Sequence, residues 1–189
     1  QEEKKKSVDE QIKEKVIGME PKNYPKNYAI IKKMSTLPGK IITLHGRDNV
    51  TEFVLHDLAG KHCFNFSKAG YFVDNPDFDH FKGVAGYCNS QSFEHADVIW
   101  ENPDEFTRHM KGSPFNKQVR NVMLQSPKRG CIDAHKIVDT VAQELAMEDP
   151  HYFCWDMKHY NHGLFIFENS NGKTEWDQED LMNGLHLLS

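Results

Sequence analysis

One stretch of the chain decides its fold, and it reads Asp149-Pro150-His151-Tyr152-Phe153-Cys154-Trp155-Asp156-Met157-Lys158-His159-Tyr160-Asn161-His162-Gly163-Leu164-Phe165-Ile166-Phe167. It holds three histidines, a cysteine and six aromatic residues, and it ends in an apolar run of four residues. Side chains alternate between two faces from residue 152 to residue 158, with Phe153, Trp155 and Met157 on one of them, which is the period of a strand. We therefore predict a strand here, paired as a hairpin with the apolar strand Leu164–Phe167.

A helical conformation of the same stretch is the alternative, and it predicts a metal site. At 100° per residue, four candidate ligands would lie within an arc of about 140° and could face one metal ion. These candidates are His151, Cys154, His159 and His162. Imidazole and thiolate groups are good ligands for zinc or iron, so the leading interpretation is a metal-binding or ligand-binding protein with such a cofactor. In the strand, His151 and Cys154 point to opposite faces, and His159 and His162 stay near the turn.

A thiol hydrolase is the second interpretation. Cys131 begins the strongest helical pattern, residues 132–147, and a helix N-terminus lowers the pKa of a thiol and makes it a better nucleophile. His162 begins the later apolar strand and would act as the base, with Asp156 orienting its imidazole ring. These residue types predict a catalytic set of Cys131, His162 and Asp156.

A basic stretch supports the third interpretation, a non-catalytic interaction module. Residues 106–132 contain no Asp or Glu, and they carry six cationic side chains: Arg108, Lys111, Lys117, Arg120, Lys128 and Arg129. The formal charge of the whole chain is -5, so removing these six positive charges leaves -11 for the rest. Such segregation predicts an acidic protein or a phosphate-bearing ligand as partner. The negative total argues against nucleic acid as the main partner.

The elements on either side of the hairpin predict an α+β fold. The patterns favour helices at residues 49–60, 93–100, 103–110, 114–124, 132–147 and 177–188, and strands at residues 41–44, within 62–88 and around 174–176. The order does not repeat as βαβ units, so a doubly wound parallel sheet is disfavoured. We expect a small, largely antiparallel sheet with several helices packed against it.

An amphipathic helix is expected at the N-terminal end, where Val8, Ile12, Val16 and Met19 form one narrow apolar stripe. A break at Leu37-Pro38-Gly39 follows it. The predicted organisation is therefore an N-terminal helix and connector over residues 1–38, followed by a single domain over residues 39–189.

Composition places the chain among ordinary globular proteins, with 38% hydrophobic and 27% charged residues in 189, and its 11 histidines make it histidine-rich. No apolar run reaches the roughly 18 residues that span a bilayer, so we expect a soluble protein. Four widely spaced cysteines, Cys63, Cys88, Cys131 and Cys154, suit free thiols in a reducing cytoplasm. Export stays open, because the chain starts at Gln1 rather than at a methionine.

Overall fold

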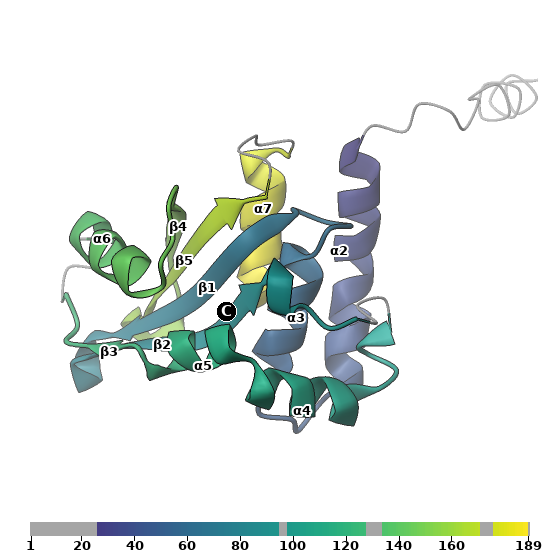
Figure 1. Cartoon of the computed structure of the whole chain (residues 1–189), viewed down its shortest axis with the longest axis horizontal. Coiled ribbons are helices and arrows are strands. Elements are labelled where there is room, and N and C mark those ends of the chain that lie inside the picture. Colours follow the sequence, from purple (N-terminus) through teal and green to yellow (C-terminus); the bar gives the residue numbers. More distant parts are fainter. Residues whose placement is uncertain (1–25, 95–97, 128–133, 171–175, 189) are drawn as a thin grey trace, which may run out of the picture.

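A five-stranded antiparallel sheet lies at the centre of the structure, a computed structural model that describes residues 26–94, 98–127, 134–170 and 176–188 (Figure 1). The strands are β1 (Phe66–Asn75), β2 (His80–Cys88), β3 (Met123–Leu124), β4 (His151–Asp156) and β5 (His162–Asn169). The α-helices are α2 (Lys26–Thr43), α3 (Val50–Ala59), α4 (Pro103–Gly112), α5 (Pro114–Asn121), α6 (Ala134–Glu144) and α7 (Gln178–Leu185). The strand order is β3-β2-β1-β5-β4, and every neighbouring pair is antiparallel. The predicted α+β class is confirmed.

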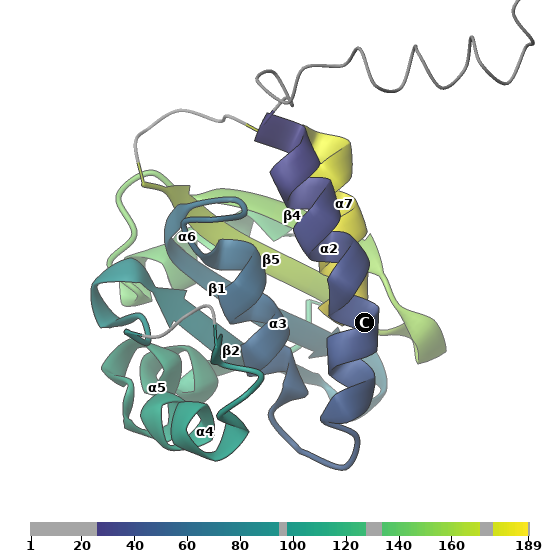
Figure 2. The same cartoon turned by 90° about the vertical axis from the view of Figure 1, so that its right-hand side faces the viewer.

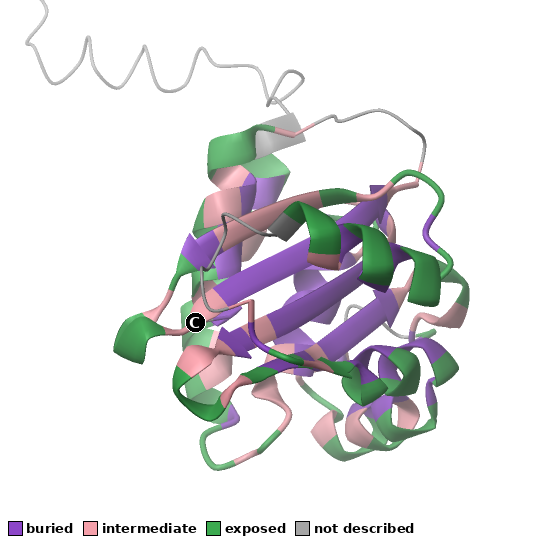
Figure 3. Cartoon of the chain, turned by 90° about the vertical axis from the view of Figure 1, so that its left-hand side faces the viewer, coloured by how far each residue is buried: buried purple, intermediate pink, exposed green. Residues whose placement is uncertain are grey.

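Helices cover both faces of the sheet and give the molecule three layers. One face packs against α2, α3 and α7 through a core that includes Leu37, Leu58 and Leu185. Figure 2 shows these three helices side by side. The other face packs against α5 and α6, with Val119 and Val141 in its core. The central strands are therefore buried on both sides, as Figure 3 shows.

The predicted β4–β5 hairpin is confirmed, with Tyr152 opposite Ile166 and Asp156 opposite His162. Phe153 and Trp155 join the core on the α7 side, whereas Tyr152 and Cys154 pack on the α6 side, as the alternation predicts. Gly163 lies opposite Trp155, and a Cβ at Gly163 would lie 2.4 Å from the indole ring. Glycine therefore lets this indole lie across β5, where it stacks on Tyr71.

The predicted break at residues 37–39 and the predicted strand at residues 41–44 are wrong, because α2 runs through both. Its buried and half-buried apolar residues follow a helical spacing of four, three and four: Ile30, Met34, Leu37 and Ile41. Burying this stripe stabilises the helix even though Pro38 cannot donate a backbone hydrogen bond. Ile42 is 74% exposed, so the apolar run was not a buried strand. The domain boundary predicted after residue 38 falls inside α2.

Glycine and proline signals at the ends of helices predict those helix ends correctly. Gly60 ends α3 as predicted, and Pro103 and Pro114 open α4 and α5. Residues 93, 94 and 98–100 are not α-helical, and the rest of that predicted helix lies outside the described residues, as do the helix at residues 7–19 and residues 174 and 175. In the part of the chain that the structure describes, no helix combines the length and apolarity that crossing a membrane requires.

Candidate functional site

The four predicted metal ligands do not come together. His151 lies opposite Phe167 and His162 lies opposite Asp156, so these histidines occupy opposite ends of the hairpin. At about 3.3 Å per residue, the five steps along β4 separate the two ends by roughly 17 Å. Within the described ranges, no group of three or more His, Cys, Asp or Glu side chains could hold a metal ion. The predicted zinc or iron site, which also included Cys154 and His159, is thus not supported by the geometry.

The cysteines correct a second expectation. Cys154 is disulfide-bonded, whereas Cys63 and Cys88 are free, so the prediction of four free thiols is wrong for Cys154. Sequence spacing alone does not reveal such a pairing. Burial raises the pKa of the Cys63 thiol to about 12, which keeps this group protonated and unreactive. Cys131, the proposed nucleophile, lies outside the described residues, so its role stays a prediction.

The predicted orienting pair is present. His162 Nδ1 lies 2.9 Å from Asp156 Oδ1, which is hydrogen-bond distance. Asp156 is 88% exposed and the His162 side chain 24% exposed, so the pair lies at the surface. This arrangement fixes the imidazole and leaves Nε2 directed elsewhere. It gives the hairpin one feature of an acid–base site.

Sequence reasoning missed Asp74, which lies directly opposite His162 on β1. Burial raises the pKa of the Asp74 carboxyl, an effect that the Ser126 hydroxyl and the His162 charge partly offset. Neither carboxylate oxygen makes a well-formed hydrogen bond with a described residue. One signal pointed to this burial, because Asp74 falls two residues after Phe72 and so faces the same buried side.

Two hollows flank the hairpin. The hollow at the turn, about 500 Å³, is lined by Asp156, Met157, His159, Tyr160, Asn161 and His162. His159 and Tyr160 both have left-handed backbone angles, with φ of 59° and 58°, which is strained for residues with a side chain. Tyr160 is 84% exposed. The turn beside this hollow therefore combines a strained backbone with an exposed tyrosine ring.

The second hollow, about 450 Å³, lies at the start of β4 and is aromatic. Its lining residues are Pro150, His151, Tyr152, Phe153, Phe167, Trp176 and Gln178. The ring of Phe167 lies 5.9 Å from that of Phe153 and 5.6 Å from that of Trp176, between centroids. Trp176 Nε1 is buried and makes no hydrogen bond with a described residue. The walls of this hollow are therefore largely aromatic.

Between the two hollows, β4 forms an open edge of the sheet, since among the described residues β5 is the one strand that pairs with it. The Met157 N–H donates to the Asn161 carbonyl, 2.8 Å away. Met157 therefore faces β5. Because the direction of the backbone groups alternates along an antiparallel strand, Phe153, four residues earlier, also faces β5, whereas the backbone groups of Tyr152 and Asp156 face outward. No described segment makes a backbone hydrogen bond to that outer side of Tyr152 or Asp156.

The basic stretch is distributed over α4 and α5. Arg108, Lys111 and Lys117 are exposed, and none makes an ion pair with a described residue. Arg120 differs, because its guanidinium lies 2.8 Å from the buried carboxylate of Glu52 and so serves the packing of α5 on α3. Lys128 and Arg129 lie outside the described residues.

Comparisons with protein-family models, curated proteins and solved structures find no match to this chain.

Proposed function

We propose that this chain is a peptide-binding protein in which the outer side of β4 takes an extended polypeptide segment as a sixth strand. The open edge carries this proposal, because outward backbone N–H and C=O groups at two-residue spacing match the hydrogen-bonding groups of another strand. The leading sequence interpretation, a ligand site in residues 151–162, is retained in this form, with a peptide in place of a metal ion. The interaction module that would bind an acidic or phosphate-bearing partner through residues 106–132 stays a separate prediction.

The aromatic hollow supports the same function by supplying a side-chain pocket. Peptides that add to a sheet edge gain affinity from main-chain hydrogen bonds and specificity from pockets for alternate side chains. Phe153 and Trp176 line a hollow at the β4 edge that is wide enough for one apolar side chain.

Selection from a random 12-residue peptide library, followed by amide hydrogen exchange, tests the proposal. Bound peptide should slow exchange at the outward amides of Tyr152 and Asp156. Tyr152→Pro removes one outward N–H and should weaken binding at least tenfold, whereas Tyr152→Ala keeps the N–H and should retain most of the affinity. Peptides that bind without protecting these amides would place the function elsewhere.

Acid–base chemistry at the turn is a second candidate, and the 2.9 Å contact between His162 and Asp156 favours it. In the thiol hydrolase that the sequence predicts, His162 would take the proton of Cys131 while Asp156 orients the ring. Because Cys154 is disulfide-bonded and Cys63 and Cys88 are free, this candidate requires reduced protein, in which the Cys131 thiol is available. Hydrolysis of p-nitrophenyl acetate by the wild type, compared with His162→Gln, Asp156→Asn and Cys131→Ser, tests this candidate. Equal rates in all four proteins would reject it.

A further inference from the structure

Charge at the two ends of β4 specifies the peptide further. Resting on the proposed function, we infer that the ligand is an extended peptide with a Lys or Arg opposite Asp156 and an apolar residue three positions later, opposite Phe153. The pattern is therefore a basic residue, two unrestricted residues and an apolar residue. It assumes antiparallel addition, the arrangement of every other strand pair in this sheet.

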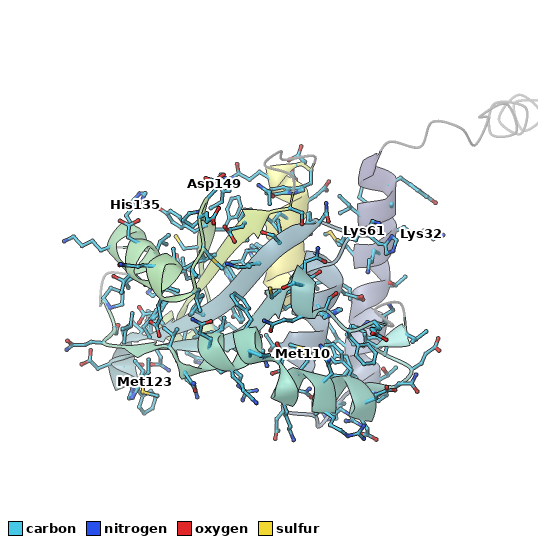
Figure 4. All side chains as sticks on the ribbon, viewed as in Figure 1. Lys32, Lys61, Met110, Met123, His135 and Asp149 are labelled. Carbon is cyan, nitrogen blue, oxygen red and sulfur yellow. The ribbon has the colours of Figure 1, made fainter. Side chains whose placement is uncertain are left out.

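The basic preference follows from the acidic character of this edge. Residues 148–162 carry Glu148, Asp149 and Asp156 against a single lysine, Lys158. Asp149 and Asp156 are 81% and 88% exposed, so both carboxylates are accessible to a ligand. Figure 4 shows Asp149 at the margin of the molecule beside β4. An anionic edge at both ends attracts a cationic segment and repels an acidic one.

Asp156 is placed to contact a ligand directly. Its Oδ1 is engaged by His162, while Oδ2 makes no hydrogen bond or ion pair with a described residue. The backbone of Asp156 faces outward, so a ligand residue opposite it would form a hydrogen-bonded pair with its side chain on the same face. A Lys or Arg at that ligand position would therefore reach the free carboxylate oxygen.

The apolar preference follows from the register. Phe153 lies three residues before Asp156 and on the opposite face, the α7 side, where the aromatic hollow lies. Because the ligand runs antiparallel, its residue opposite Phe153 comes three positions after the residue opposite Asp156. That position forms a non-hydrogen-bonded pair, in which side chains approach more closely. An apolar side chain there would enter the hollow beside Phe167 and Trp176.

Affinity measurements on the selected 12-residue peptides test the inference, using fluorescence polarisation and the full chain. The enriched sequences should share the basic and apolar residues at this spacing. Replacing the apolar residue by alanine should weaken binding at least tenfold, as expected for loss of a buried side chain. Asp156→Asn should weaken binding about three- to fivefold, the scale of an exposed ion pair.

A matched control separates a local contact from the effect of net charge. Asp139→Asn removes the same charge from the exposed face of α6 and should leave affinity unchanged. Peptides that protect the Tyr152 amide but lack the basic residue, or respond equally to both Asn variants, overturn this inference and leave the proposed function intact. If no selected peptide protects that amide, the proposed function fails and this inference fails with it.

Discussion

At one margin of the sheet, β2 is closed by α5 and by the two-residue strand β3, whereas at the other margin β5 is the one described strand that pairs with β4. The outward N–H groups of β2 are occupied. Gly83 donates to the Val122 carbonyl at 3.1 Å, and Gly86 donates to Asn116 Oδ1 at 2.8 Å. Figure 4 shows Met123 of β3 at this closed margin and His135 of α6 at the other.

The open edge of β4 differs from the protected edges of most soluble proteins. Soluble proteins protect exposed edges with charge, short strands or covering segments, because an open edge pairs with other chains. Here β4 has six residues, most of them aromatic or half-buried, and acidic residues at both ends are its only charged protection. The proposed peptide site would account for this difference between the two edges of the sheet.

The largest expected effect comes from forcing the closed edge apart. A Cβ at Gly83 would lie 1.8 Å from the Val119 carbonyl oxygen, so Gly83→Ala must displace α5 from β2. We expect the free energy of unfolding to fall by at least about 3 kcal/mol in urea denaturation. Gly39→Ala is the control, since no atom lies within 4 Å of its Cβ and alanine suits the interior of α2. Equal stability of the two variants would contradict the close packing of α5.

Lowering the pH should reduce the free energy of unfolding through a histidine on the closed side of the sheet. Burial lowers the pKa of His56 to about 4, and its ring packs edge-on against Tyr87 of β2. The unfolded chain binds this proton near pH 6.5 and the folded chain only near pH 4, so the stability is complete above pH 6.5 and is lost as the pH falls toward 4. The loss should approach roughly 3 kcal/mol. Urea denaturation of wild type and His56→Gln from pH 7 to 4 measures it, and parallel curves would refute it.

A smaller effect is expected from the polar link beneath α5. Asn116 accepts the Gly86 N–H and donates to Glu52 and to the Met110 carbonyl. Asn116→Ala leaves a β2 amide and a buried carboxylate short of partners, so unfolding should cost about 2 kcal/mol less. Asn121→Ala, at an exposed position of the same helix, should change stability by no more than about 0.5 kcal/mol. A similar loss in both would contradict a specific role for the buried Asn116 amide.

Sequence alone predicted elements whose signals are local. Two-residue alternation through Phe153 and Trp155 identified the hairpin, and the turn then brought Asp156 to His162. Sequence-based prediction failed where contacts between residues distant in the sequence determine the structure. The core that buries Leu37 outweighs Pro38 in α2, and the disulfide of Cys154 depends on another part of the chain.

The open edge was out of reach for the same reason. Alternation shows that residues 151–156 form a strand, but strand order follows from long-range pairing that no single segment encodes. Asp74 shows the same limit, because the Ser126 hydroxyl and the His162 charge, which partly offset the raised pKa of its carboxyl, come from distant segments. The candidate residues are therefore ones that the fold, rather than a motif, brings together.

The smallest expected effect tests the open edge itself. The N–H of Tyr152 faces outward, so Tyr152→Pro should unfold within about 1 kcal/mol of Tyr152→Ala, which also lacks the hydroxyl that contacts His135. The N–H of Phe153 faces β5, so Phe153→Pro should lose a ladder hydrogen bond and about 2 kcal/mol or more relative to Phe153→Ala. Thermal and urea denaturation of the four variants provide the comparison. If proline were equally damaging at both positions, the outer side of β4 would be occupied, and the contrast between the two margins would fail.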